Sequence, residues 1–361
     1  MLTVLTKRNY IMKRSYLILA TLICSLNLFA QGYKLPSYYS QRELKAPVAV
    51  KEELELMRRE IAAKNLKYQV GYTSVSEVPL EKFSSLKVPA PDRDGKIRSE
   101  IQADVTKSAK LSVSQDKLSK EAVRPYVYGE PFLWELDLRK AGLVTPVRDQ
   151  KEAYGASWAF ATMAAYESSY KIITKKEINT SEQFVLDCSG AGTWESGDPY
   201  SIFLWMTKNR RKVADESSVP YTGSPMKCNG ASPATDYYAT EVGGVTAQYY
   251  SIPTVIEIKD AICRHGAIVA GVNVTDSFKN YVEGIFIGHK SNTKIFGCNH
   301  LVTIIGWDNW KACWLIKNSW GTDWGSECGY GSERGYMWLD YDSNNIGYTA
   351  TWVQASQTGL K

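Results

Sequence analysis

The stretch Gly155-Ala156-Ser157-Trp158-Ala159-Phe160 decides the fold prediction, because a long helical pattern begins inside it. From there apolar residues recur at a helical period, at Phe160, Met163, Ala164 and Tyr170. This period predicts a helix over Ser157–Thr174. A reacting group at Ser157 would lie at the positive end of the helix dipole, where negative charge is stabilised.

Segments on both sides of this helix complete a set of motifs. They are Val144-Thr145-Pro146-Val147-Arg148-Asp149-Gln150, Phe278-Lys279-Asn280-Tyr281-Val282-Glu283-Gly284-Ile285-Phe286, Cys298-Asn299-His300-Leu301-Val302 and Trp314-Leu315-Ile316-Lys317-Asn318-Ser319-Trp320-Gly321. In this order they resemble the papain family of peptidases (family C1), over about Asp137 to Val353. The C-terminal part, Gly335 to Trp352, is similar to bacterial branches of that family.

The resemblance implies an α+β fold of two lobes, one helical and one built like an antiparallel β-barrel, behind an N-terminal pro-segment. The order of the patterns agrees, since β-type apolar runs follow the helical ones. These runs are Ala267–Val274, Leu301–Trp307 and Cys313–Lys317.

The resemblance also implies a site for peptide-bond hydrolysis. Ser157 occupies the nucleophile position, and His300 is the base that later acts as the acid. Asn318 would orient the His300 ring, and Trp320 would cover their hydrogen bond and border the substrate. Gln150 and the backbone N–H of Ser157 would form the oxyanion hole.

Two glycines are expected to meet the polypeptide substrate. Gly197, in Ser196-Gly197-Asp198-Pro199, resembles the glycine that hydrogen-bonds the extended substrate backbone. Gly271 would face the pocket for the second residue upstream of the scissile bond. Because glycine has no side chain, a roomy pocket is expected there.

Ser157 departs from the family, whose nucleophile is cysteine. A thiol near pKa 8.5 can be held as a thiolate beside an imidazolium, whereas a hydroxyl must lose its proton during attack. Loss of a triad nucleophile costs on the order of 10^4 or more in rate. A second departure is one extra residue between Gln150 and Trp158, which could displace the oxyanion donor.

Three hypotheses follow for the activity. The chain is a family member inactivated at Ser157, a serine-using hydrolase of low activity, or a non-catalytic protein that holds peptides in the cleft. The retained His300, Asn318 and Gln150 favour a working hydrolase, and the intact Gly197 permits peptide binding. The serine could be natural or engineered, and the export signal described next favours a natural gene product.

The N-terminal third divides into two segments. Residues 1–30 are typical of an export signal, with Lys13 and Arg14 before an apolar run over 16–29, and Met12 is an alternative start. A secreted or periplasmic protein is therefore expected, with lipid attachment at Cys24 a weaker alternative. Residues 31–130 form a pro-segment that is expected to inhibit the peptidase domain, residues 131–361, intramolecularly.

Within the pro-segment, Leu54, Met57 and Ile61 lie on one face of a predicted helix over Val50–Asn65. That helix needs a partner surface, and a following extended stretch is expected to lie along the cleft. The polar residues from Ser84 to Arg124 are typical of a linker or of an extended pro-segment.

Composition and cysteines narrow the remaining possibilities. The formal charge of +5 arises from 43 basic and 38 acidic residues that are interspersed, which argues against nucleic-acid binding. No apolar run reaches the length of a membrane span. The protein is expected to be a monomer. Without a CxxC pair and with only 3 histidines, no metal or other cofactor is expected. His265 and His289 stand beside glycines in predicted loops and are interpreted as surface residues.

Beyond Cys24, six cysteines allow up to three disulfides in an exported protein. They are Cys188, Cys228, Cys263, Cys298, Cys313 and Cys328. The resemblance pairs Cys188 with Cys228. It also implies that another bridge of the family is absent, with its ends at Ala153 and Trp194.

Overall fold

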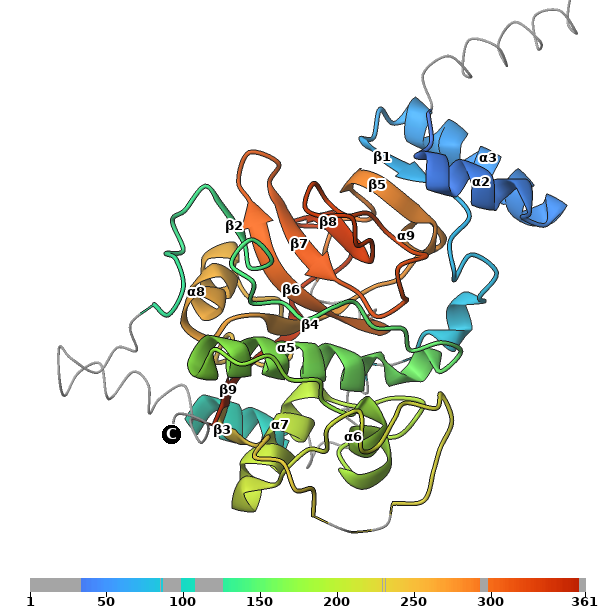
Figure 1. Cartoon of the computed structure of the whole chain (residues 1–361). Coiled ribbons are helices and arrows are strands. Elements are labelled where there is room, and N and C mark those ends of the chain that lie inside the picture. Colours follow the sequence, from blue (N-terminus) through green and yellow to red (C-terminus); the bar gives the residue numbers. More distant parts are fainter. Residues whose placement is uncertain are drawn as a thin grey trace, which may run out of the picture.

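The computed structural model describes residues 34–84, 86, 99–107, 126–228, 230, 232–292 and 298–356. The expected export signal lies outside these residues. Helix α5 (Ser157–Thr174) crosses the middle of the molecule, with most of the sheet on one side and helices α6 (Glu182–Cys188) and α7 (Pro199–Thr207), together with the β9–β3 end of the sheet, on the other (Figure 1). The predicted two-lobed α+β fold is confirmed.

Helix α5 has the bounds that the apolar period predicts, and it is buried along nearly its whole length. It ends where Lys175 takes a left-handed conformation, with its N–H bonded to the carbonyl of Lys171. Because α5 packs against both lobes, its first residue lies at the boundary between them.

The strands form one sheet in the order β1-β5-β8-β7-β6-β4-β9-β3, and β2 pairs with β6. Their bounds are β1 Tyr68–Val70, β2 Glu135–Asp137, β3 Ala239–Gly244, β4 Ile268–Val272, β5 Tyr281–Phe286, β6 His300–Asp308, β7 Cys313–Lys317, β8 Tyr336–Asp340 and β9 Tyr348–Ala355. All pairs are antiparallel except β5 with β8. The three predicted apolar runs correspond to β4, β6 and β7, and β6 is buried at every residue.

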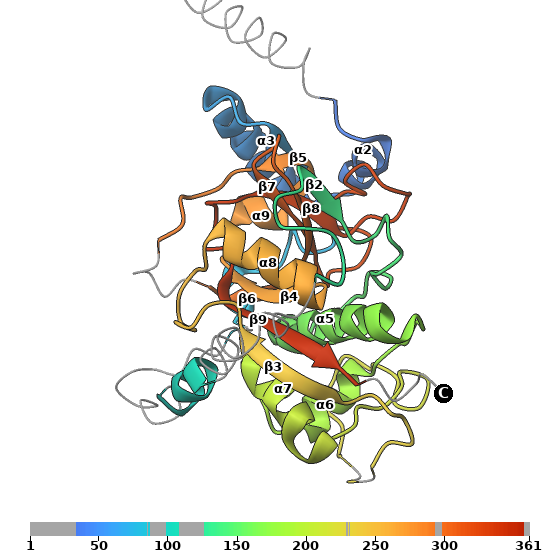
Figure 2. The same ribbon diagram turned by 90° about the vertical axis from the view of Figure 1, so that its left-hand side faces the viewer.

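The remaining helices lie around this frame (Figure 2). They are α2 Ser37–Leu44, α3 Val48–Ala63, α8 Val255–His265 and α9 Asp276–Lys279, with short 3-10 turns η1 Leu80–Lys82, η2 Tyr154–Ala156 and η3 Lys208–Arg210. Helix α8 begins at a capping box made by Thr254 and Glu257 and packs on the sheet. Among the described residues, no helix is long and apolar enough to cross a membrane.

The N-terminal segment extends over both lobes. Helices α2 and α3 and strand β1 lie at the sheet edge, where Tyr68 pairs with Gly284 of β5. The predicted helix over Val50–Asn65 is α3, shifted by two residues, with Leu54 and Ile61 buried. The stretch interpreted as a polar linker contains a helix over residues 99–107, which contacts the lobe of α7 (Figures 1 and 2).

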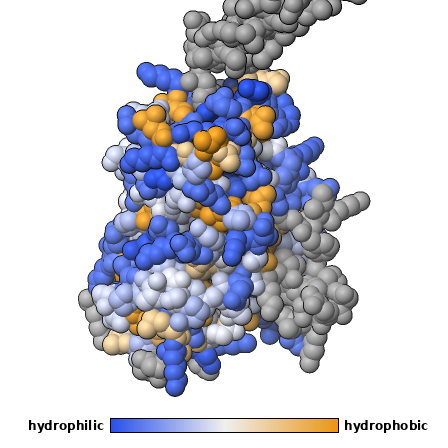
Figure 3. Space-filling view, turned by 90° about the vertical axis from the view of Figure 1, so that its right-hand side faces the viewer, coloured by the Kyte–Doolittle hydropathy of each residue, from blue (hydrophilic) through white to orange (hydrophobic). Residues whose placement is uncertain are grey.

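On the face shown in Figure 3, apolar residues form small separate groups among hydrophilic ones. This agrees with a surface on which the charges are interspersed. The sequence also favoured surface positions for His265 and His289. That interpretation holds for the exposed His289 but is wrong for His265, which is buried and stacks on Trp352 with ring centroids 3.8 Å apart.

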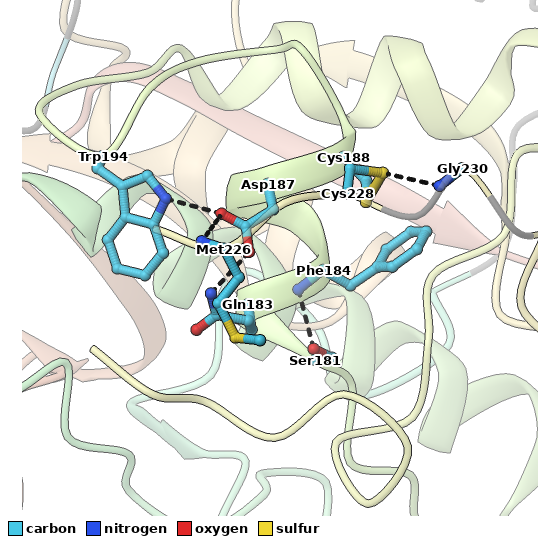
Figure 4. Close-up of a disulfide and its surroundings, with 9 residues drawn as sticks. All are labelled: Ser181, Gln183, Phe184, Asp187, Cys188, Trp194, Met226, Cys228 and Gly230. Carbon is cyan, nitrogen blue, oxygen red and sulfur yellow. Dashed lines mark hydrogen bonds between the residues drawn. A yellow bond between two sulfur atoms is a disulfide. The ribbon is translucent and has the colours of Figure 1, made fainter. Parts of the chain in front are cut away.

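The disulfide between Cys188 and Cys228 is present, as the resemblance implied. Next to it Asp187 accepts hydrogen bonds from the indole N–H of Trp194 and the backbone N–H of Met226 (Figure 4). Trp194 thus anchors its loop at a position where the family has a cysteine. The other cysteines that the structure describes, Cys263, Cys298, Cys313 and Cys328, are free thiols.

Candidate active site

Ser157 begins helix α5 and is fully buried. Its Oγ accepts a hydrogen bond of 3.0 Å from the backbone N–H of Leu301. Leu301 directly follows His300 at the start of β6, so the hydroxyl lies one residue from the candidate base. The fold therefore brings the helix start and the histidine strand together across the two lobes.

His300 is fully buried, and its Nε2 lies 2.8 Å from Oδ1 of Asn318. That amide oxygen also accepts the backbone N–H of Ser319 at 2.8 Å, which fixes the orientation of the amide. Because an amide oxygen can only accept, Nε2 carries the proton and Nδ1 is the basic nitrogen. Asn318 thus selects the tautomer that a general base requires.

Burial lowers the pKa of His300 to about 4, although the hydrogen bond that the ring donates to Asn318 opposes this shift. The ring is therefore neutral at neutral pH. Among the described residues, Nδ1 of His300 has no hydrogen-bond partner, and neither has Nδ2 of Asn318 or Nε1 of Trp320. Three buried polar atoms without partners at one place are typical of a site that awaits a ligand.

Trp320 covers the histidine, as expected. It is buried, and its ring centroid lies 4.6 Å from that of His300. Its own position is held by ring contacts with Phe278 and Trp324. The indole therefore shields the bond between His300 and Asn318 from water.

Gln150 is held on both sides of its amide. Its Oε1 accepts the Ser319 hydroxyl at 2.6 Å, and Nε2 donates to the carbonyl of Ala153 at 2.9 Å. The backbone is also fixed, because Gln150 N–H donates to the Ser319 carbonyl and its own carbonyl accepts the Tyr221 hydroxyl. An amide nitrogen carries two hydrogens, so one N–H remains for an oxyanion.

The loop that follows Gln150 begins with a left-handed turn. Lys151 has φ 51°, and its N–H donates to the carboxylate of Asp149 at 2.8 Å. Further along, Gly155 lies so close to the backbone of Trp194 and Glu195 that an added Cβ would come within 2.5 Å of it. The loop thus remains tightly packed without the disulfide of the family.

Gly197 packs on the face of Trp158, where an added Cβ would lie 2.3 Å from the indole ring. Its backbone forms a bridge with Leu86 of the N-terminal segment. This is the backbone contact that a substrate was expected to make.

Gly271 lies on β4, also against Leu86. A Cβ added there would lie 3.2 Å from the Leu86 side chain and 2.9 Å from the carbonyl of Tyr348. Cys298 lies beside the same position, at 3.5 Å. The place of the expected pocket is thus occupied by Leu86.

Phe83 fills the space over the histidine. It is buried, and its ring centroid lies 5.1 Å from that of Trp320, 5.4 Å from that of Tyr154 and 6.2 Å from that of His300. Ser84 Oγ donates to the carbonyl of Glu195 at 3.2 Å. Phe83, Ser84 and Leu86 therefore lie along the cleft between the lobes.

The structure brings together every residue that the sequence analysis placed at the site. These residues are Gln150, Ser157, Gly197, Gly271, His300, Asn318 and Trp320. The sequence analysis missed Ser319, which holds Gln150, and Tyr154, which contacts Phe83. The sequence signal for Tyr154 is a large aromatic residue between the small residues Ala153 and Gly155, shortly before the predicted helix.

A cluster of buried charges lies behind the site. Glu167 accepts from Thr145 and Thr180, and Lys317 donates to the carbonyl of Thr145 at 2.7 Å. Nearby Glu182 is almost completely buried, and burial, reinforced by Glu167, raises its pKa to about 8. Within the described residues, no group of three or more His, Cys, Asp or Glu side chains could hold a metal ion.

The chain is similar in sequence to plant cysteine proteases. It is 27% identical over 318 residues to thiol protease aleurain of Arabidopsis thaliana, covering 86% of this chain and 78% of that protein. It is 30% identical over 218 residues to pro-cathepsin H of Medicago truncatula, covering 59% of this chain and 58% of that protein.

Solved structures share the fold, including precursor forms. Procathepsin L2 from the larval midgut of Tenebrio molitor has a TM-score of 0.64 at 21% identity, covering 93% of this chain and 99% of that one. The proform of the ragweed allergen Amb a 11 has a TM-score of 0.62 at 20% identity, covering 88% and 92%. Bromelain protease from Ananas comosus, in complex with the E64 inhibitor, has a TM-score of 0.52 at 28% identity, covering 62% and 100%.

The family model of the papain family cysteine proteases matches residues 134–354, which is more than half of the chain. The match covers both lobes and all the candidate site residues. The chain therefore belongs to the papain family of cysteine proteases.

Proposed function

We propose that this chain is the precursor of an exported papain-type peptidase whose nucleophile position holds Ser157, so that its hydrolysis of peptide bonds is slow or absent. The precursor has a signal over 1–30, a pro-segment over 31–130 and a peptidase domain over 131–361. Its substrates are polypeptides, and it works as a monomer outside the cytosol, secreted or periplasmic. The likeness of its C-terminal part, Gly335 to Trp352, supports a place in the bacterial branches of the family.

The observation that carries the proposal is the bond from the backbone N–H of Leu301 to the Ser157 hydroxyl, one residue after the buried ring of His300. In a cysteine form, a thiol would give its proton to Nδ1, and the resulting thiolate and imidazolium would stabilise each other. The helix dipole of α5 would further favour the thiolate. Ser157 cannot form this pair, because its hydroxyl stays protonated until the moment of attack.

The remaining groups support a hydrolytic mechanism. Nδ1 of His300 would accept the proton of the nucleophile and later pass it to the leaving amine. The tetrahedral oxyanion would be bound by the backbone N–H of Ser157 and the second N–H of Gln150. Asn318 keeps the ring oriented throughout, and Trp320 limits access of water to their hydrogen bond.

The positions of Phe83 and Leu86 support the inhibitory role of the pro-segment. Phe83 covers His300, and Leu86 pairs with Gly197 and occupies the pocket beside Gly271. A peptide cannot reach the nucleophile position while these side chains are in place. Removal of the pro-segment would therefore expose the whole cleft.

The test compares Ser157 with Ser157→Cys after pro-segment removal, on a mixed peptide library under mild reducing conditions. The cysteine form is expected to cleave at least about 10^4-fold faster, since it regains the ionisable nucleophile. This activity should disappear with His300→Ala and with thiol alkylation.

Two results would favour the alternatives. If the serine form cleaves as fast as the cysteine form, then the chain is a serine-using hydrolase. If neither form cleaves any peptide but both bind peptides, then it is a non-catalytic peptide-binding protein.

A further inference from the structure

We propose that the rings of Tyr154, Trp320 and His300 form an aromatic slot. This slot selects a large aromatic side chain on the leaving-group side of the substrate. This inference rests on the proposed function, because it assigns the substrate preference of the same cleft. Tyr154 is the specificity-determining residue of this slot.

The occupant of the slot shows what fits it. Phe83 is only 2% exposed, and it contacts the rings of Tyr154, Trp320 and His300 at centroid distances of 5.4, 5.1 and 6.2 Å. Its ring is tilted by 59° to Tyr154 and stands at 86° to His300. Such tilted and edge-to-face arrangements are the preferred geometries of aromatic pairs.

The side of the scissile bond follows from the proposed chemistry. His300 gives its proton to the leaving amine, so the residue that carries this amine must lie beside the His300 ring. The oxyanion donors, Gln150 and the N–H of Ser157, bind the carbonyl on the other side of the bond. A side chain that reaches the place of Phe83 therefore belongs to the leaving group.

The slot can also hold the backbone of its ligand. The indole N–H of Trp320 is buried and lacks a hydrogen-bond partner among the described residues. Leaving such a donor unsatisfied is unfavourable, and a peptide carbonyl beside the slot would remove this penalty. Trp320 would then contribute both a ring face and a donor.

Tyr154 is well suited to determine specificity because it is held in place without being part of the catalytic chemistry. It lies in the turn η2 directly before helix α5 and is half-buried. The turn itself is fixed, because the neighbouring Gly155 packs on the backbone of Glu195. Replacement of Tyr154 should therefore change the slot and leave Ser157 and His300 in position.

The first experiment measures peptide binding to the serine chain, so that it does not depend on cleavage. A full chain with a protease recognition sequence in residues 108–125 is folded, cut and freed of its pro-segment. Two peptides are compared that differ only in Phe or Ala at the residue after the expected scissile bond. The Phe peptide should bind about tenfold more tightly, which is the size of one or two aromatic contacts.

Tyr154→Ala should reduce this Phe-to-Ala ratio to about twofold, whereas Tyr154→Phe should keep it. Tyr330→Ala, a partly exposed tyrosine elsewhere on the surface, is the matched control and should leave the ratio unchanged. An unchanged ratio in Tyr154→Ala would overturn the proposal. So would equal binding of the two peptides by the unchanged chain.

The second experiment repeats the comparison on Ser157→Cys as a ratio of kcat/KM. The same preference for Phe and the same loss in Tyr154→Ala are expected. If Ser157→Cys cleaves neither peptide, the proposed catalytic function fails while the binding ratio still tests the slot. If Ser157→Cys cleaves both peptides equally well in the presence of Tyr154, the slot proposal fails while the catalytic function stands.

A double-mutant cycle covers the case in which Tyr154→Ala disturbs folding. In the cut full chain, Phe83→Ala and Tyr154→Ala should each speed dissociation of the pro-segment by several-fold. Combining them should add little to either change, because both remove the same contact. Fully additive effects would show that Tyr154 acts through the fold and would overturn the assignment.

Discussion

Glu182 shows how a single buried carboxyl group can limit stability. Its pKa is raised to about 8, mainly by burial, so the folded chain keeps the proton that the unfolded chain loses above about pH 4.5. Between pH 4.5 and about pH 8, ionisation of Glu182 in the unfolded chain lowers the free energy of the unfolded state relative to the folded state. The contribution of this group to stability is therefore present at low pH and is lost as the pH rises towards 8.

Glu182→Gln should remove this penalty, because the amide has the same shape and no charge. At pH 8 the variant is expected to unfold with a free energy higher by up to about 3 kcal/mol, while at pH 4 the two chains should be equal. Chemical denaturation at both pH values measures this difference. Glu53→Gln, a change at an exposed position of helix α3, is the control. A variant that is less stable at pH 8 would show that the carboxylate is paired and charged.

At the scale of elements, the disulfide between Cys188 and Cys228 joins the end of α6 to a long loop. It closes a separation of 40 residues, and the chain-entropy estimate for such a loop is about 4 kcal/mol. The same loop carries Met226, which bonds to Asp187 beside Trp194. Reduction of this disulfide should therefore increase the mobility of the loop that ends at Gly197 and forms one wall of the cleft.

The double variant Cys188→Ser, Cys228→Ser should lower the free energy of unfolding by about 2 to 4 kcal/mol. Cys263→Ser, a change at a buried free thiol, is the control for the loss of sulfur alone. Thiol titration of the unfolded chain beginning at residue 31 should find four thiols without reductant and six with it. Fewer than four free thiols without reductant would mean that the chain forms further disulfides.

The same scale shows which elements a sequence can predict. Helix α5 and strand β7 have the predicted bounds because the apolar pattern of each ends where the element itself ends. The helix over residues 99–107 was not predicted. It buries only Ile101 and Val105, and it is held mainly by polar contacts with a distant part of the chain.

The candidate site divides in a similar way. His300, Asn318 and Gln150 could be predicted because each stands in a motif of the family. The contact between Phe83 and Tyr154 could not, since it depends on where a pro-segment crosses a cleft, and local pattern does not contain that information. His265 was misjudged for the same reason, because Trp352, which covers it, comes from the last strand.

At the scale of the whole molecule, the pro-segment is attached to both lobes. On the sheet side, Arg42 pairs with Asp323 at 2.7 Å, and the Tyr39 hydroxyl donates to the carbonyl of Gly325 at 2.6 Å. On the helical side, the Tyr200 hydroxyl donates to Asp104 at 2.8 Å, and Gln102 bonds to the backbone of residues 247 and 249. Phe83 and Leu86, which fill the cleft, lie between these two attachments in the sequence. Each attachment therefore raises the effective concentration of the other.

This arrangement predicts that the helix over residues 99–107 slows release of the pro-segment although it does not touch the site. In a chain folded whole and then cut within residues 108–125, Gln102→Ala with Asp104→Ala should speed dissociation by about tenfold or more. Two or three lost hydrogen bonds, one of them to a carboxylate, account for that size. Dissociation can be followed as peptide binding to the exposed cleft after dilution. Lys107→Ala, an exposed change on the same helix, should leave the rate unchanged. If the double variant dissociates no faster than the unchanged chain, then the sheet-side attachment alone holds the pro-segment, and the contacts of the helix with Tyr200 and Tyr249 contribute nothing to inhibition.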